Sequence, residues 1–107
     1  MQLNEFTKSA REMVILTKTI NVFKKLLAPP RVILFGSRAK GKFKKYSDFD
    51  FAIDIKRPAL KVQRKLNDEV KKYSGLYTID IAYLKSVDAD FKNIVLNTGK
   101  IIYEKRS

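Results

Sequence analysis

The sequence predicts an α/β domain in which a mixed β-sheet of about four strands packs against helices. Two observations support this prediction. Stretches with helical apolar spacing alternate with short strand-like runs, and glycine or proline stands at most of the breaks between them. A length of 107 residues allows one domain, residues 1–107, and leaves no room for a second.

An amphipathic helix over about residues 5–27 is the first expected element. Apolar residues recur at every third or fourth position from Phe6 to Leu27, and two consecutive prolines then end the pattern. The recurring positions are Phe6, Ala10, Met13, Leu16, Ile20, Phe23 and Leu27. Thr17 and Thr19 weaken the middle of this helix, so two shorter helices are an alternative.

The rest of the domain, residues 30–104, holds the expected strands. Residues 31–35 are apolar after the arginine and lie between Pro30 and Gly36, which is typical of a strand covered on both faces. One short helical turn should follow, ended by Gly41. Further strands are expected where polar and apolar residues alternate, at 48–55 and 76–84, and at the short apolar run 100–103.

Two more helices are expected between these strands. The first begins at Pro58, extends to about residue 72 and is ended by Gly75. The second covers residues 87–97, with Ser86 as its N-cap and Gly99 closing it.

The composition restricts the chemistry and the partners. The chain has no cysteine and no histidine, which excludes disulfides, thiolate zinc sites, cysteine catalysis and imidazole bases. The 23 Lys and Arg residues outnumber the 11 Asp and Glu residues and give a formal charge of +12, which favours anionic partners. No apolar run approaches the ~20 residues that cross a bilayer, so we expect a cytoplasmic protein without a membrane partner.

Three aspartates are candidate metal ligands. Asp48 and Asp50 share one face of the strand at 48–55, with Cα atoms about 7 Å apart, and Asp80 lies on the polar face of the strand at 76–84. Without a cation, like charges at such short range repel one another. Carboxylates without nitrogen or sulfur ligands suit the hard cations Mg²⁺ and Mn²⁺.

Gly36 and Ser37 form a candidate phosphate site, because they stand at a turn from a strand into a helix. Glycine lets the backbone approach a phosphate closely, and the exposed amides of such a turn bind anions. Mg²⁺ is usually shared with phosphate oxygens, so the two candidate sites together predict a bound nucleoside triphosphate. Two metal ions would neutralise the attacking and leaving oxygens of an in-line displacement.

The spacing Gly36-Ser37, ten residues, then Asp48-x-Asp50 resembles the signature of the minimal nucleotidyltransferase (MNT) domain, in the DNA polymerase β-like superfamily. The likeness extends over about residues 30–104. It includes Val-Ile-Leu-Phe-Gly-Ser-Arg-Ala, Ser-Asp-Phe-Asp-Phe-Ala, Thr-Ile-Asp-Ile around Asp80, and the closing Gly-Lys-Ile-Ile-Tyr. One departure is Lys40 before Gly41, where the family usually has arginine.

This resemblance implies a nucleotidyltransferase fold, an activity and a partner. Asp48 and Asp50 would hold the metals, Asp80 would complete the site and help to deprotonate the acceptor, and Gly36 and Ser37 would bind the β and γ phosphates, with Arg38 as a further phosphate contact. The reaction would transfer AMP from ATP, with Mg²⁺, to a protein hydroxyl and release pyrophosphate. MNT proteins often pair with a HEPN-domain ribonuclease toxin, so the resemblance implies an antitoxin that adenylylates a tyrosine of that toxin.

Other interpretations stay open at this stage. The chain could be a catalytically idle MNT fold that neutralises a partner by binding alone, or it could modify a small molecule. Loop 40–45 and helix 58–72 are more basic than modification of a protein requires, which indicates an acidic partner or an RNA contact. In the extreme case the chain is a small basic nucleic-acid-binding module with an incidental acidic cluster.

Overall fold

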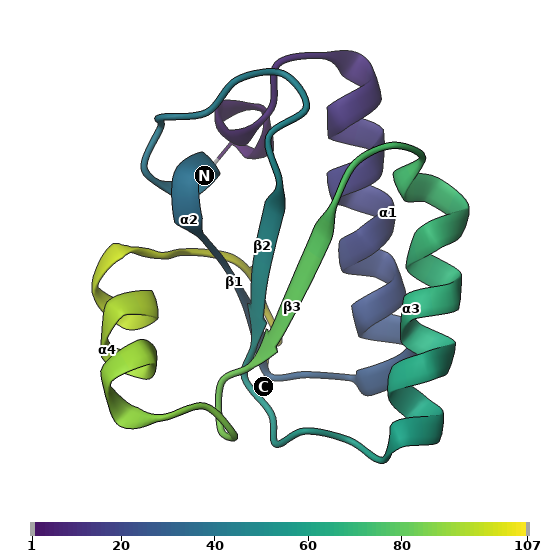
Figure 1. Ribbon diagram of the computed structural model, residues 1–107, viewed down its shortest axis with the longest axis vertical. Helices are drawn as coiled ribbons and strands as arrows, with labels where there is room; N and C mark the ends of the chain where they lie inside the picture. The colour runs from purple at the N-terminus through teal and green to yellow at the C-terminus, as the bar shows by residue number, and fades with distance from the viewer. Residues whose placement is uncertain (1, 107) are drawn as a thin grey trace.

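The computed structural model describes residues 2–106, and its helices and strands follow one another in the predicted order (Figure 1). The helices are η1, a 3-10 turn (Leu3–Phe6), α1 (Ala10–Leu27), α2 (Gly36–Ala39), α3 (Leu60–Ser74) and α4 (Ala89–Thr98). The strands are β1 (Arg31–Phe35), β2 (Phe49–Ile53), β3 (Ile79–Tyr83) and β4 (Lys100–Glu104). The four strands form one sheet with both parallel and antiparallel pairs, which confirms the predicted mixed sheet.

The sheet has the strand order β3-β2-β1-β4. Strand β1 is antiparallel to both of its neighbours, whereas β2 and β3 are parallel. Strand β1, which is apolar after Arg31, is an inner strand, and its central residues Val32, Ile33 and Leu34 are all buried. This confirms the prediction that both of its faces are covered.

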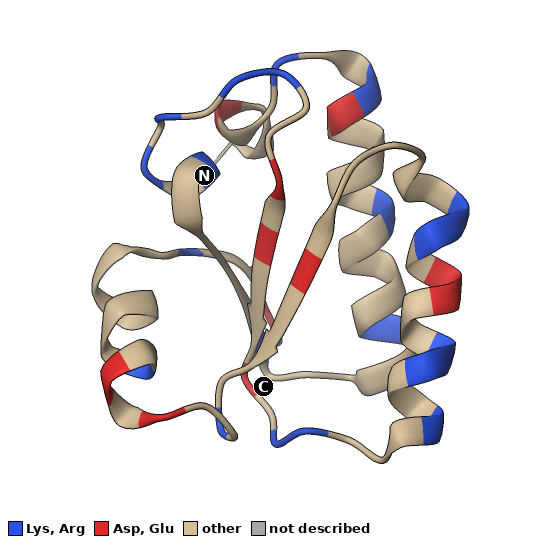
Figure 2. Ribbon diagram, viewed as in Figure 1, with Lys and Arg blue, Asp and Glu red and all other residues tan. Residues whose placement is uncertain are grey.

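Helices cover the two faces of the sheet unequally (Figure 1). On one face, α1 and α3 lie side by side and bury the main core, in which Phe23 packs edge-on against Phe51 with ring centroids 5.2 Å apart. On the other face, α4 packs over a smaller apolar cluster that includes Ile33, Ala52 and Val95. Asp48 immediately precedes β2, and Asp50 and Asp80 are the second residues of β2 and β3, so all three are near the ends at which these strands begin. The loop that precedes β2 is rich in basic residues (Figure 2).

The first helix is shorter than predicted and is not divided. Helix α1 begins at Ala10 because Ser9 is extended and its side chain accepts a hydrogen bond from the backbone N–H of Glu12 at 3.2 Å, as an N-cap does. Phe6 belongs to the separate turn η1, so it continued the apolar spacing without continuing the helix. Both Thr17 and Thr19 lie within the uninterrupted helix, and Thr19 is fully buried.

The other boundaries differ from prediction by a few residues. Helix α3 starts two residues later than expected and ends at Gly75, and α4 ends at Gly99, as predicted. The N-cap of α4 is Asp88 rather than Ser86: the Asp88 carboxylate accepts from the N–H of Phe91 at 2.8 Å, whereas the Ser86 hydroxyl accepts from the N–H of Arg57. Among the described residues, no helix is long and apolar enough to span a membrane.

Candidate active site

Two of the three candidate aspartates face each other across neighbouring strands. Asp50 and Asp80 are register partners in the parallel pair β2–β3, so their side chains project from the same face of strands that lie about 4.8 Å apart. Asp48 is exposed and stands just before β2. The structure therefore places Asp50 beside Asp80, while Asp48 lies just outside the paired strands.

The electrostatics of the site favour a cation. The pKa of Asp50 is raised to about 6, chiefly by burial and in addition by the charge of Asp80, by a hydrogen bond between the two carboxyl groups and by the charge of Asp48. The positive charge of Arg38 acts in the opposite direction without cancelling these effects. An ionised Asp50 therefore lacks sufficient compensating charge from the protein itself.

The donor chemistry fits Mg²⁺ or Mn²⁺, since only carboxylate oxygens are offered. As the side chains lie, however, no three acidic groups within residues 2–106 form a ready-made metal site. The predicted set of Asp48, Asp50 and Asp80 is thus not preassembled. A metal held by all three would require their side chains to turn toward it.

The glycine–serine turn touches this cluster directly. Gly36 opens α2 with a left-handed backbone, φ +73°, and a Cβ placed on it would collide with Oδ2 of Asp50 and lie 3.1 Å from Cγ. Only glycine combines that backbone with so close an approach. The first amides of a helix have no partners within it. The candidate phosphate site of Gly36 and Ser37 therefore adjoins the candidate cation site at Asp50.

Arg38 has a different role from the predicted phosphate contact. Its side chain is fully buried, and its guanidinium lies 3.8 Å from the centroid of the Phe49 ring. It donates to the carbonyl of Ser47 at 2.7 Å from Nη2 and, more weakly, to the carbonyl of Asp48 at 3.3 Å from Nε. A guanidinium without exposed surface does not reach a bound phosphate, so this part of the sequence interpretation does not fit the structure. Arg38 instead holds the backbone that carries Asp48.

Glu12, which the sequence reasoning missed, is the partner of Arg38. Its carboxylate is fully buried and accepts hydrogen bonds from Nη1 of Arg38, the backbone N–H groups of Lys8 and Tyr46, and the hydroxyl of Tyr77, all at 2.8–2.9 Å. Burial alone would raise the pKa of Glu12, but these hydrogen bonds outweigh it and lower the pKa to about 2. One feature of the sequence could have indicated that Glu12 is buried. It lies one helical turn before Ile15 and Leu16, and therefore on the same, buried face of α1.

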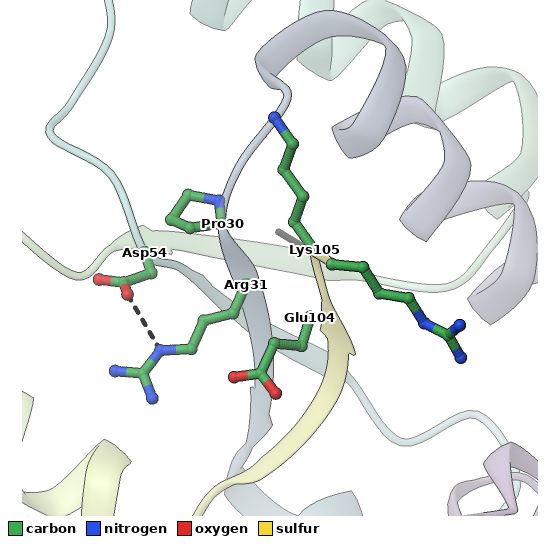
Figure 3. A pocket seen from close by; sticks show the side chains of 6 residues that line it. Pro30, Arg31, Asp54, Glu104 and Lys105 are labelled. Carbon is green, nitrogen blue, oxygen red and sulfur yellow. Dashed lines mark hydrogen bonds and ion pairs between the residues drawn. The ribbon is translucent and has the colours of Figure 1, made fainter.

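A second charged hollow, of about 790 Å³, lies at the opposite end of the sheet (Figure 3). Arg31 at the start of β1 and Asp54 just after β2 form an ion pair there, with Nε and Oδ2 3.0 Å apart. Glu104 and Lys105 add one charge of each sign. Arg106 also lines the hollow, which therefore carries three basic and two acidic side chains. Because the hollow lies at the end of β2 away from Asp48, it is not part of the candidate active site.

A strand-to-helix turn that offers free amides, next to carboxylates on neighbouring strands, is typical of enzymes that transfer groups from nucleoside triphosphates. The family model described as "Polymerase beta, Nucleotidyltransferase" matches residues 17–107. The chain therefore belongs to the polymerase β nucleotidyltransferase family, which confirms the resemblance seen in the sequence.

Known proteins resemble the chain over most of its length. It is 35% identical, over 88% of its own length and 82% of the relative's, to the probable protein adenylyltransferase MntA of Haemophilus influenzae. It is 40% identical, over 64% of its length and 74% of the relative's, to the putative protein adenylyltransferase MJ0141 of Methanocaldococcus jannaschii. The fold matches the crystal structure of a toxin–antitoxin with AMP-PNP, with TM-score 0.63 and 21% identity over 84% of this chain and 73% of that one.

The close approach of Asp50 to Gly36 can be tested with a matched pair of variants. Gly36→Ala and Gly41→Ala both place a side chain on a left-handed backbone, φ +73° and +72°, but only at Gly36 would the new Cβ meet a neighbour. Each should lose about 1–2 kcal/mol of unfolding free energy in urea titrations. Only Gly36→Ala should also abolish the thermal shift given by ATP with Mg²⁺. An equal nucleotide response in both variants would contradict the arrangement.

The raised pKa of Asp50 predicts how stability depends on pH. The pKa of about 6 in the folded protein exceeds the ordinary aspartate pKa of 3.8. The stability that protonated Asp50 contributes is therefore fully present below pH 3.8 and is lost as the pH rises through 6. In EDTA, Asp50→Asn should therefore melt several degrees above the parent protein near neutral pH and lose this difference in acid. Mg²⁺ should raise the melting temperature of the parent but not of the variant. A variant that is less stable at neutral pH would refute the electrostatic account.

Proposed function

We propose that this protein transfers AMP from ATP to a hydroxyl group of a partner protein, using Mg²⁺, with Mn²⁺ as an alternative metal. The observation that supports this most strongly is the contact between Gly36 and Asp50, because the proposed phosphate-binding turn thereby adjoins a proposed metal ligand. The family supplies the reaction class, and the names of the relatives MntA and MJ0141 indicate a protein as the acceptor.

Each predicted residue then has a distinct task. The turn at Gly36 and Ser37 binds the β and γ phosphates, and Asp48, Asp50 and Asp80 hold the metal ions, which neutralise charge on the phosphates. The acceptor oxygen forms a bond to the α-phosphorus while the bond to the bridging oxygen breaks, and pyrophosphate leaves with that electron pair. Asp80, exposed at the edge strand β3, takes up the proton of the acceptor hydroxyl.

We further propose that the acceptor is a tyrosine of a HEPN-domain ribonuclease toxin and that the protein acts as an antitoxin in the cytoplasm. The MNT resemblance supports this, as does the structural neighbour described as a toxin–antitoxin with AMP-PNP. A second function, neutralisation by binding alone, is favoured by one observation: the carboxylates do not form a ready-made metal site.

Intact-mass spectrometry separates these two functions. A HEPN partner should gain one or more AMP units when it is incubated with this protein, ATP and Mg²⁺. Asp48→Asn should abolish the gain, since Asp48 is a proposed metal ligand. Asp54→Asn is the matched control, because Asp54 lies beyond the other end of β2 and pairs with Arg31. A stable complex that silences the partner with no gain in mass would contradict transfer and establish neutralisation by binding.

A further inference from the structure

A hollow of about 340 Å³ lies beside the ends at which β2 and β3 begin. It is lined by Ser9, Arg11, Lys45, Tyr46, Gly75, Leu76 and Tyr77. Two large side chains here are strongly exposed: Leu76, which is 96% accessible, and Tyr46, which is 60% accessible. Exposed apolar groups around a hollow are typical of a surface that binds another protein. These residues, with the hollow, are called the Tyr46–Leu76 groove below.

Tyr46 has an unfavourable backbone conformation that contacts with buried residues stabilise. Its φ of +72° is unfavourable for a residue with a side chain, and its N–H is fixed by a hydrogen bond to the buried Glu12 carboxylate at 2.9 Å. Its ring rests on the buried Tyr77, with centroids 5.1 Å apart. Strain of this kind persists where the surrounding structure enforces it, and it is concentrated at functional positions.

The groove is positively charged. Arg11 and Lys45 are its only ionisable lining residues apart from the tyrosines, and Nζ of Lys45 lies 5.3 Å from the centroid of the Tyr46 ring. The exposed Lys42 and Lys44 extend this charge along the preceding loop (Figure 2). An occupant that complements the groove therefore carries acidic side chains and an apolar group that packs against Leu76 and Tyr46.

The groove is close to the proposed chemistry. Tyr46 precedes Asp48 by two residues and Leu76 precedes Asp80 by four, so the Cα separations are at most about 7 and 15 Å. An extended peptide advances about 3.3 Å per residue, so about two to five residues bridge the groove and the carboxylates. A segment anchored in the groove can thus present a hydroxyl to Asp80.

We propose that the Tyr46–Leu76 groove is the docking surface for the acceptor, and that it takes an acidic protein segment with an apolar anchor about two to five residues from the modified hydroxyl. This proposal rests on the proposed transfer to a protein. Arg11 and Lys45 supply the charge complementarity, while Leu76 and Tyr46 supply the apolar contact.

Fluorescence anisotropy with a labelled random glutamate–tyrosine copolymer tests this surface. Leu76→Asp, and the double change Arg11→Glu with Lys45→Glu, should each weaken binding about tenfold or more, or about 1.4 kcal/mol. The matched controls are Leu60→Asp, at a side chain 59% exposed at the start of α3, and Lys61→Glu with Lys65→Glu. These should bind nearly as well as the parent protein, because they change apolar surface and charge elsewhere.

The outcomes distinguish docking from catalysis. All these variants should keep the thermal shift given by ATP with Mg²⁺, since none alters the proposed metal or phosphate site. Equal binding by Leu76→Asp and Leu60→Asp would overturn the docking surface. The docking surface would also be overturned if oligouridylate displaced the copolymer from the parent protein and bound more weakly to the same groove variants. That result would show that the groove binds nucleic acid. Groove-dependent binding without AMP transfer by the parent protein would support docking and contradict the proposed function instead.

Discussion

The buried ion pair between Glu12 and Arg38 is the interaction on which the rest of the structure depends. Both side chains are fully buried, and Nη1 and Oε1 are 2.8 Å apart. Through them, α1 is joined to α2, to the carbonyls at the start of β2 and to Tyr77 before β3. Removing one partner from such a pair typically costs about 3–5 kcal/mol, because the other charge stays buried and unpaired.

The hydrogen-bond network around Glu12 explains how the protein tolerates the repulsion among the carboxylates of the candidate active site. The surroundings of Glu12 and of Asp50 shift the pKa values of these carboxyl groups in opposite directions. The pKa of Glu12 falls to about 2, while that of Asp50 rises to about 6. Glu12 is surrounded by hydrogen-bond donors, whereas Asp50 faces other carboxylates. The network around Glu12 thus stabilises the ends of the strands that a metal-free site would destabilise, and it fixes the backbone of Tyr46 at the edge of the proposed docking surface.

Features set by neighbouring residues were predictable from the sequence. The alternation placed Asp50 on the polar face of β2 and Asp80 on the polar face of β3, and Gly75 and Gly99 correctly marked helix ends, because each depends on local geometry. That the two aspartates are register partners depends instead on the pairing of β2 with β3. The sequence predicted a phosphate site at Gly36 near the cation site, but the contact between Gly36 and Asp50 itself depends on the pairing of β1 with β2. Asp88 and Ser86 are both suitable caps, and the choice follows from the hydrogen bond that Ser86 accepts from Arg57, which lies far away in sequence.

The role of Arg38 could not be predicted for the same reason. Its partner Glu12 lies 26 residues earlier, and an arginine after a glycine–serine turn carries no local sign of whether it faces phosphate or the interior. The apolar spacing placed Met13 on the buried face of α1, whereas Glu12 is fully buried and Met13 only partly so. Only tertiary packing revealed that a charged residue of this helix faces the core.

The most direct test of the account is a double-mutant cycle on Glu12→Gln and Arg38→Gln, read as the affinity for ATP with Mg²⁺ while each variant is folded. If Arg38 acts by holding the Asp48 backbone through Glu12, both single changes should weaken ATP binding to a similar extent, and the double change should be no worse than either. If Arg38→Gln alone loses affinity while Glu12→Gln retains it, Arg38 contacts the phosphates and the central claim is wrong.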